Sequence, residues 1–351
     1  MNFKKITLVI GNRNFYGQTR KPWVPMNPDK IKSTFEQSNY EVRKLKFHEL
    51  VNPSEQLTDS VILYSFSQRA NVRAYIKDLV RFLDNGTNLL IPNYDLLKCH
   101  ENKGYQELYK KKLGFESLHA IYLSSRDEIS EYDIEYPVVL KKVDGSNGKD
   151  VYLIHNEDEL IAGIKKFEKV GLATQLDLIR RKYFRKKKSY REYPNYSNRV
   201  DYEQYKVYVK QEQNFILQQF VPDLTFDYRV LVLQDRYYIM KRHNRKNDFR
   251  ASGAKIHDFN FDPDPKLFDF ARSVYQKFDT PFLSLDICGK EGNYFLIEFQ
   301  ASHFGLGAYQ KSKGYYSPEE NNWLFHEAKP DLETDIAGAV IRYLQKKQKS
   351  L

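Results

Sequence analysis

The first hundred residues alternate short apolar runs with segments of helical spacing. Four runs have the length and β-branched content of buried strands, and they cover residues 6–10, 40–45, 60–64 and 88–91. Apolar side chains recur at helical spacing over 71–83, and Asn27 caps a second predicted helix that ends near Ser38. This order of elements predicts a small α/β domain, residues 1–95, with a mainly parallel sheet.

The rest of the chain predicts further helices and several hairpins. Helices are predicted near 99–113, 158–170, 265–278 and 331–347, and strands at 138–143, 151–154 and 215–221. Two hairpins cover residues 228–242 and 282–300; the first has a predicted three-residue turn, Gln234–Arg236, and the second a turn at 289–293. We therefore predict two more domains, residues 96–221 and 222–351, and an α/β fold class with α+β character.

The composition fits a soluble protein of two or three compact units. The chain has 351 residues, of which 41% are hydrophobic, enough for several cores. Its two cysteines, Cys99 and Cys288, neither build a disulfide framework nor supply a zinc site. No stretch approaches the ~20 apolar residues that a membrane span requires, so we expect a cytoplasmic protein.

Most of the positive charge is concentrated in one segment. The formal net charge is +10, and residues 180–199 contribute +8 of it, from nine Lys or Arg and the single acid Glu192. Aromatic residues interleave with cations over about 179–208: Tyr183, Phe184, Tyr190, Tyr193 and Tyr196. An acidic substrate or product is the favoured partner, ahead of a solvated loop. Nucleic acid is least favoured, because the segment has no RNA-binding motif.

A lysine and a glycine-bearing loop end the apolar strand near residue 141. Lys141 is followed closely by Gly145-Ser146-Asn147-Gly148. Glycines let backbone N–H groups approach an anion, and a lysine adds the charge that phosphates need. The spacing differs from a Walker A loop, so an ordinary hairpin turn is the alternative for this feature taken alone.

Two carboxylates are predicted to share one face of the last hairpin. Strand alternation buries the odd-numbered apolar residues and places Asp286 and Glu298 on the other face. With a turn at 289–293, Asp286 pairs with Leu296, and Glu298 becomes its diagonal neighbour, about 7–8 Å away between backbones. Such a pair can hold Mg²⁺ together with substrate phosphates. Two exposed acids on a wet sheet face are the alternative.

The hairpin at 228–242 carries a cluster of cations. A three-residue turn places Arg229 directly opposite Lys241, which is unfavourable unless an anion lies between them. Arg242 and Arg250 extend the cluster. Arginine suits oxyanions, so a triphosphate and a substrate carboxylate are the expected occupants. A solvated cationic face is the alternative.

Taken in chain order, these motifs form a recognisable set. They are Asn102-Lys103, Pro137 to Lys141 with Gly145 to Gly148, Gln218 to Val221, Asp227 to Arg229, Lys241-Arg242, Phe249 to Ser252, Leu285-Asp286 and Ile297 to Gln300. The set resembles the ATP-grasp superfamily, closest to the branch of glutathione synthetase and the ribosomal-protein glutamate ligases. The resemblance covers roughly residue 94 to the C-terminus and implies a two-subdomain ATP-grasp fold. The preceding domain resembles the Rossmann-like N-terminal domain of these enzymes.

The resemblance implies a role for each motif. The implied ATP-binding set is Lys103, Lys141, Lys241, the loop Gly145-Ser146-Asn147-Gly148, the adenine hinge Gln219-Phe220-Val221, and Asp223 near the ribose. Arg229, Arg242 and Arg250 would hold the transferring phosphoryl group and the acceptor carboxylate. Asp286, Glu298 and Gln300 would hold two Mg²⁺ ions, with Mn²⁺ as an alternative. Departures from the family pattern are Gln300 and Ser252 in place of asparagine, and Gln219 in place of an acid.

These implied roles describe an ATP-dependent carboxylate–amine ligase that forms an amide through an acylphosphate. The expected acceptor is a small molecule or glycan with a carboxylate, such as an acidic sugar or peptide of a surface-polysaccharide pathway, used with an amine donor. The loop Asn12–Trp23, with Arg13 and Arg20, is one candidate acceptor surface, and His303 is another candidate lining residue. The alternatives are an ATP-grasp kinase and a non-catalytic, nucleotide-responsive binding protein that uses the basic segment.

Overall fold

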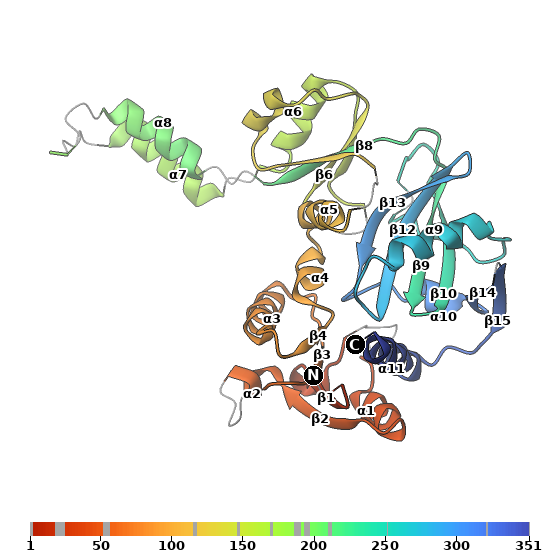
Figure 1. Cartoon of the computed structure of the whole chain (residues 1–351). Coiled ribbons are helices and arrows are strands. Elements are labelled where there is room, and N and C mark those ends of the chain that lie inside the picture. The colour runs from red at the N-terminus through yellow and green to blue at the C-terminus, as the bar shows by residue number, and fades with distance from the viewer. Residues whose placement is uncertain are drawn as a thin grey trace. The chain divides into compact units, whose positions relative to one another are not determined.

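The computed structural model divides the chain into two compact units. It describes residues 3–17, 25–51, 57–114, 118–145, 148–168, 171–185, 191–192, 197–209, 213–250, 252–320 and 322–350. Unit 1 consists of residues 1–118 and 221–351, and unit 2 of residues 119–220 (Figure 1). Parallel and antiparallel sheets with helices confirm the predicted α/β fold class, while the three-domain division stays a prediction.

The N-terminal part of unit 1 is a parallel sheet with strand order β2-β1-β3-β4. Its elements are β1 (Lys5–Ile10), η1 (Asn12–Asn14), α1 (Pro28–Gln37), β2 (Glu41–Lys46), α2 (Phe47–Val51), β3 (Val61–Tyr64), α3 (Ala70–Leu83) and β4 (Leu89–Ile91). The Asn27 side chain accepts hydrogen bonds from the N–H groups of Asp29 and Lys30, which confirms it as the cap of α1.

The helix predicted at 99–113 begins four residues later than predicted, and a separate helix that was not predicted precedes it. These are α4 (Tyr94–Cys99) and α5 (Lys103–Lys112). Glu101 between them has φ of 48°, a left-handed conformation that no continuous helix contains. Asn102 then caps α5 by accepting from the N–H of Tyr105, so a capping side chain restarts the helix.

The large sheet of unit 1 has the strand order β13-β12-β9-β10-β14-β15, and β11 also pairs with β10. Its strands are β9 (Phe226–Leu233), β10 (Arg236–His243), β11 (Ile256–Asp258), β12 (Phe282–Lys290), β13 (Asn293–Gln300), β14 (Gly314–Glu319) and β15 (Asn322–Glu327), with α10 (Gly307–Lys311) before β14. The last hairpin was not predicted. It contains Pro318 and is mostly half-exposed, so it lacks a continuous apolar run.

The two faces of this sheet belong to different cores, because successive side chains of a strand point to opposite faces. Leu231 joins α11 (Leu332–Lys349) and the N-terminal sheet in one core. Val230 packs in another core with α9 (Pro265–Tyr275). Figure 1 shows α11 beside α1 and α9 against the strands. The N-terminal sheet and the large sheet are therefore joined through one face of the large sheet.

Unit 2 contains an antiparallel sheet with strand order β5-β8-β6-β7. Its elements are β5 (Ala120–Leu123), η2 (Arg126–Glu131), β6 (Val138–Lys142), β7 (Val151–Ile154), α6 (Glu157–Lys165) and β8 (Phe215–Gln219). Leu160 and Ile164 of α6 pack on Leu140 and Ile154 of the sheet. Strand β5 was not predicted.

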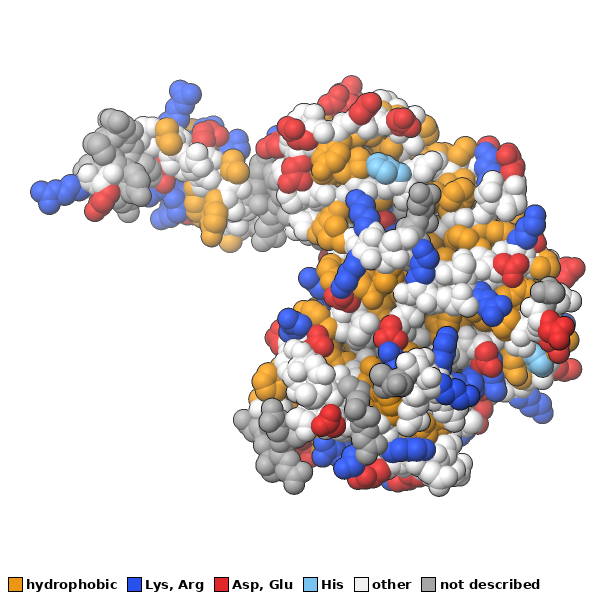
Figure 2. All heavy atoms as spheres, viewed as in Figure 1, with side chains coloured by type: hydrophobic (Ala, Val, Ile, Leu, Met, Phe, Trp, Pro, Cys, Tyr) orange, Lys and Arg blue, Asp and Glu red, His pale blue; other side chains and the backbone are white. Residues whose placement is uncertain are grey.

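The basic segment of unit 2 contains helices that the sequence did not predict. They are α7 (Leu172–Ile179), the π-helical turn η3 (Arg180–Phe184) and α8 (Asn198–Val209). Figure 2 shows hydrophobic and cationic side chains together on the surface of this helical pair. Tyr190, Tyr193 and Tyr196 lie outside the described residues. Across the described chain, no helix has both the length and the apolar character needed to span a membrane.

Candidate active site

Four charged side chains form a buried network on the large sheet. Arg229 of β9 lies opposite Asp286 of β12, and its Nε and Nη2 donate to the two carboxylate oxygens at 2.8 Å each. Arg242 of β10 donates to both oxygens of Asp227 at 2.6 Å each, and its Nη2 also lies 2.9 Å from Asp286 Oδ2. Two carboxylates and two guanidinium groups therefore balance each other; we call these four side chains the acid–arginine network.

Burial makes this balance necessary. The side chains of Arg242 and Asp286 are 5% and 11% exposed. Burial alone would raise the pKa of Asp286, but Arg229 and Arg242 outweigh it and hold that pKa below its usual range. Burial raises the pKa of Asp227, although Arg242 opposes the rise. Asp286 is therefore ionised at neutral pH, at the position expected to bind a metal ion.

The predicted pairing of Arg229 with Lys241 is wrong. The turn between β9 and β10 has two residues, Gln234–Asp235, so Arg229 pairs with Met240 instead. Gln234 has φ of 62°, the positive φ that the first central residue of a two-residue type II′ turn has. The shorter turn shifts the register by one residue, and a shift of one residue moves a side chain to the other face of the sheet.

Lys241 therefore lies on the face opposite to Arg229. Its Nζ is 3.9 Å from the centroid of the Phe226 ring, a cation–π contact. The same register brings Asp227 opposite Arg242, and Asp227 had no predicted role. If a two-residue turn is assumed, the sequence alone predicts the pairing of Asp227 with Arg242. In that register they are the only two residues of opposite charge that lie opposite each other in β9 and β10.

Asp286 and Glu298 lie directly opposite each other, and the predicted diagonal placement is wrong. The turn consists of Glu291 and Gly292, with φ of 54° and 79°. A bulge between Asp286 and Ile287 shifts the register by one more residue. Directly opposite residues have Cβ atoms about 4.5–5.5 Å apart, so the two carboxylates are closer than the sequence indicated.

The residues at this position fit a magnesium ion. Asp286, Glu298 and Gln300 offer two carboxylates and an amide oxygen, ligands of the type that Mg²⁺ accepts beside substrate phosphates. Gln300 Nε2 donates to Glu298 Oε1 at 3.4 Å, which aligns the two side chains. Asp286 Oδ2 accepts from both arginines and Oδ1 from one, so a carboxylate with about four lone-pair sites retains room for a cation.

A cluster of acids alone does not form this site. In the described part of the chain, no group of three His, Cys, Asp or Glu residues is arranged to hold a metal ion. The predicted set has only two such residues, so it depends on the amide of Gln300 and on oxygens of a bound substrate. The metal assignment therefore stays a prediction.

Three other predicted residues of unit 1 have local partners or helix positions. Arg250 donates from Nε and Nη2 to Asp248, at 2.9 and 3.0 Å. Asp223, at φ of 65°, lies 3.3 Å from Lys290 Nζ. Lys103 begins α5. The ligand roles of these residues stay predictions.

In unit 2, the predicted phosphate-binding residues lie at the end of β6. Lys141 Nζ donates to the side-chain oxygen of Gln218 on β8, which orients the lysine. Gly145 and Gly148 have φ of 127° and 69°, a region that favours glycine. Residues 146–147, which are Ser and Asn, lie outside the described residues.

The predicted adenine hinge coincides with a boundary between the units. Gln219 ends β8, where its N–H donates to the carbonyl of His119 at 2.8 Å and its side-chain oxygen accepts from His119 N at 3.3 Å. The chain leaves unit 2 between Phe220 and Val221. Val221 is buried with Leu118, which is the last residue of unit 1 before the chain enters unit 2.

The candidate acceptor surfaces are only partly described. Arg13 is exposed, with φ of 56°, whereas Arg20 and Trp23 lie outside the described residues. His303 is half-buried, and its ring centroid lies 6.3 Å from that of His100. The contact with a second histidine favours a structural position for His303.

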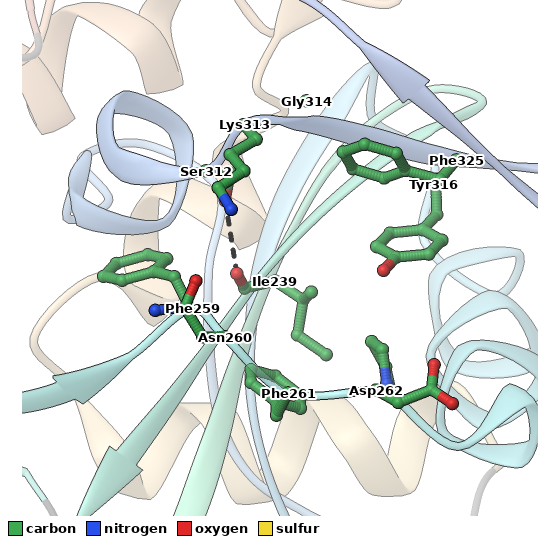
Figure 3. A pocket seen from close by; sticks show the side chains of 11 residues that line it. Ile239, Phe259, Asn260, Phe261, Asp262, Ser312, Lys313, Gly314, Tyr316 and Phe325 are labelled. Atoms are coloured by element: carbon green, nitrogen blue, oxygen red, sulfur yellow. Dashed lines mark hydrogen bonds between the residues drawn. The ribbon is translucent and has the colours of Figure 1, made fainter.

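A pocket of about 430 Å³ opens on the other face of the large sheet (Figure 3). Ile239 of β10 lines this pocket. Side chains alternate between the two faces along a strand, so Met240 and Arg242 of β10 point to the opposite face. Aromatic rings of Phe261 and Tyr316 line the pocket, and no predicted site residue does. The pocket is therefore separate from the acid–arginine network.

No family model matches the chain, and no curated protein matches it. Several solved structures do. The ATP-grasp ligase PsnB, in complex with the precursor peptide PsnA2 and AMPPNP, has a TM-score of 0.51 at 10% identity, covering 98% of this chain and 99% of the other. D-alanine–D-alanine ligase from Bacillus anthracis has a TM-score of 0.50 at 11% identity, covering 98% of each chain.

A third similar structure is the ADP complex of PurK, N5-carboxyaminoimidazole ribonucleotide synthetase. Its TM-score is 0.50 at 13% identity, with 90% of this chain and 75% of the other covered. At such low identity a likeness shows the fold and nothing finer, so the predicted branch stays a prediction. All three likenesses extend over both units, and together they show that the chain has the ATP-grasp fold.

Proposed function

We propose that the chain is an ATP-dependent carboxylate–amine ligase. The observation that carries the proposal is the carboxylate of Asp286, which two arginines hold directly opposite Glu298 in a chain of ATP-grasp fold. The similar structures support it, because two of them are named as ligases and the third as a synthetase. One of them holds an ATP analogue and another ADP, which supports ATP as the nucleotide here.

The proposal assigns nucleotide binding to residues at the ends of β6 and β8 in unit 2 and to a few residues of unit 1. Lys141 binds phosphate oxygens, the backbone at Gly145 and Gly148 approaches them closely, and residues 219–221 read the adenine edge. Asp223 and Lys103 complete this set. A lysine ammonium and backbone N–H groups suit a triphosphate, because both donate hydrogen bonds without adding negative charge.

The proposal assigns metal binding and stabilisation of the reacting groups to side chains of the large sheet. Asp286, Glu298 and Gln300 hold magnesium, which neutralises charge on the triphosphate. Arg229 and Arg242 stabilise the transferring phosphoryl group and the acceptor carboxylate, and each is already oriented by an aspartate. Such preorganised charge needs no rearrangement as negative charge develops, which is the main source of rate in this kind of chemistry.

The reaction has two steps. The γ-phosphoryl group of ATP moves to a carboxylate oxygen of the acceptor, which gives ADP and an acylphosphate. The lone pair of an amine then attacks the acyl carbon and phosphate leaves, so that an amide forms. We propose an acidic sugar, glycan or peptide as the acceptor, in a surface-polysaccharide pathway.

A screen of acceptors by ADP release tests the proposal. Purified protein is incubated with ATP, a panel of sugar acids and acidic peptides, and a panel of amines, with and without Mg²⁺. We expect Mg²⁺-dependent ADP release that requires both a carboxylate and an amine. ADP formed with a carboxylate but no amine requirement would indicate a kinase instead, and ATP binding without ADP under any condition would contradict the ligase.

The nucleotide half of the proposal has a matched pair of variants. Lys141→Met removes the ammonium that contacts Gln218, whereas Lys142→Met removes one that pairs with Asp144 at 2.9 Å. A hydrogen bond to a charged group contributes about 1.5–3 kcal/mol, so we expect ATP affinity to fall about tenfold to a hundredfold in Lys141→Met only. Calorimetric titration with ATP measures both variants.

A second function, that of a non-catalytic nucleotide-responsive binding protein, has one observation in its favour. Both oxygens of Asp286 already accept hydrogen bonds from arginines, so the protein charge there is balanced without a metal ion. In that case ATP would bind with similar affinity whether or not Mg²⁺ is present, and no acceptor would release ADP. The same titrations and the acceptor screen separate the two functions.

A further inference from the structure

The helical pair in the basic segment has an unusual distribution of polarity. Within α7, η3 and α8, the described residues include none that is buried. Large apolar side chains of α7 and η3 are instead exposed: Leu172 at 79%, Leu176 at 67%, Ile179 at 49% and Tyr183 at 67%. Exposed apolar side chains in such number indicate a surface that meets a partner.

Charged groups connect the two helices. Asp177 lies 2.9 Å from Arg181 within α7 and η3, and Arg181 lies over the Tyr205 ring of α8 at 3.4 Å. Asp201 of α8 pairs with Arg185, which follows η3. Asp177 and Asp201 are therefore engaged at the contact between the helices, and the exposed apolar side chains lie outside it.

The apolar side chains of α7 and η3 form one stripe, which points away from α8. Leu172, Leu176, Ile179 and Tyr183 follow each other at intervals of four, three and four residues, so they share one side of a helix. At about 100° per residue, Asp177 and Arg181 lie about 140–180° from Leu172, on the side that faces α8. We call these four residues the α7 stripe.

Positive charge surrounds the α7 stripe. Arg180 and Lys182 flank it, and both are exposed. Over residues 171–212 the sequence has eleven Lys or Arg and five Asp or Glu, a balance of +6. An apolar stripe with cations on its flanks is typical of helices that lie in the plane of a membrane interface and prefer anionic lipids.

Two other partners suit the stripe less well. A second copy of this chain would bring a second charge of +6 against the first, which opposes self-association. A nucleic acid would use the cations but not the stripe, because Leu172, Leu176 and Ile179 have no rings on which bases stack. Anionic lipid is complementary to the cations and the apolar side chains at once.

We propose that the α7 stripe binds the surface of a lipid bilayer that contains anionic lipid. Leu172, Leu176, Ile179 and Tyr183 enter the headgroup region, while Arg180 and Lys182 contact lipid phosphates. Binding of this kind is peripheral and reversible, and it needs no membrane-spanning helix. The proposal is independent of the ligase activity, since no residue of the α7 stripe belongs to the proposed site.

Vesicle sedimentation with the full chain tests the proposal. We compare vesicles of equimolar phosphatidylglycerol and phosphatidylcholine with vesicles of phosphatidylcholine alone. Binding is expected only to the anionic vesicles and should weaken as salt is raised. Leu176→Gln with Ile179→Gln keeps the charge and the helical propensity, and it should weaken binding at least tenfold because two apolar side chains no longer enter the interface.

A double substitution on α8 is the matched control. Val200 and Val207 are 52% and 66% exposed, and their helical positions place them away from the contact with α7. Val200→Gln with Val207→Gln makes the same chemical change and should leave binding within about twofold. Equal loss in both double variants, or no loss in the first, overturns the proposal, as does equal binding to phosphatidylcholine alone.

Two further measurements distinguish lipid binding from internal packing and from self-association of the α7 stripe. If Leu176→Gln with Ile179→Gln lowers the melting temperature by several degrees, the stripe packs inside the protein and the proposal fails. If the wild type is a dimer by light scattering and this variant a monomer, the stripe joins two copies instead. We expect the same melting temperature and the same oligomeric state in both.

Discussion

Asp286 accepts two hydrogen bonds from Arg229, its direct neighbour across β12 and β9, at 2.8 Å each. The carboxylate assigned to the metal ion and the arginine assigned to the phosphoryl group are thus one hydrogen-bonded pair. Their charges are coupled, because removal of the carboxylate would take from Arg229 and Arg242 a partner that both of them contact. Substitution of Asp286 therefore changes stability and chemistry together, and other residues test the site more cleanly.

Glu298→Gln is the cleanest test of the metal assignment. Glu298 is half-buried and contacts Gln300, so an isosteric amide preserves the packing. We expect ADP release to fall by about 10²–10³, as for loss of one electrostatic contact at a reacting centre, and the free energy of unfolding to change by less than ~1 kcal/mol. Asp286→Asn should also cost about 3–5 kcal/mol of stability, because buried guanidinium charge loses its partner.

The control for Glu298→Gln is Glu291→Gln in the same hairpin. Glu291 is exposed at the turn, and its substitution should leave both activity and stability unchanged. Unaltered Mg²⁺-dependent turnover in Glu298→Gln would rule out Glu298 as a metal ligand. Urea unfolding of both variants shows whether any loss of activity comes from loss of structure.

Asp227 and Arg242 should be strongly coupled in stability. They pair through two hydrogen bonds of 2.6 Å, with side chains 10% and 5% exposed. Arg242→Met leaves the buried Asp227 without this partner, and Asp227→Leu leaves Arg242 with Asp286 as its remaining ion-pair partner in the acid–arginine network; breaking such a buried pair costs about 3–5 kcal/mol. The double variant should cost at least ~1–2 kcal/mol less than the sum of the two single variants. Additive losses in urea unfolding would show that the pair is not coupled.

Gly305 limits the space beside Arg229. A Cβ at this position would lie 2.7 Å from Arg229 Nη1, so the guanidinium would have to shift, and this shift would disturb its hydrogen bonds to Asp286. We expect Gly305→Ala to lower kcat/KM for ADP release about tenfold, because displacement of a catalytic group by a fraction of an ångström is costly.

Gly307→Ala is the control for this substitution. Its Cβ would lie 3.5 Å from Met240 Sδ, an ordinary van der Waals distance. Activity of this variant should equal that of the wild type. Equal activity of Gly305→Ala and Gly307→Ala would mean that Arg229 tolerates displacement or does not act in the reaction.

The sequence predicted the strands at the site correctly, but it predicted the wrong residue pairs across these strands. Apolar alternation located β9, β10, β12 and β13, and chain order located the charged residues on them. The register depended on turn length, and each turn is shorter than predicted. Gln234 adopts a left-handed conformation that glycine or asparagine normally signals, so the sequence contained no mark of a two-residue turn. The bulge beside Asp286 likewise leaves no trace in the apolar pattern.

The helices of the basic segment also could not be predicted from the sequence. Its charge run resembles a solvated loop, and the cations among its apolar residues obscure the helical spacing. Leu172, Leu176 and Ile179 do not join a core, so the usual argument from core burial to helix did not apply. Local ion pairs such as Asp177 with Arg181 support these helices instead.

A buried histidine provides a test of the fold that does not involve the proposed activity. His100 is 2% exposed, and its Nδ1 has no hydrogen-bond partner among the described residues. Its Nε2 lies 3.5 Å from Gln68 Oε1. Burial lowers the pKa of His100 to about 3, with smaller contributions from His303, Arg73 and Lys77.

Stability should therefore fall as the pH drops below about 6.5, the ordinary pKa of histidine. The unfolded chain then binds a proton at His100 that the folded protein does not bind, so the free energy of unfolding decreases by about 1.4 kcal/mol per pH unit until the folded pKa is reached. Burial lowers the pKa of His303 as well, which acts in the same direction. Urea unfolding at pH 7.5, 6 and 5 should show this slope, and His100→Gln should reduce it. A slope that is unchanged in His100→Gln would show that other groups cause it.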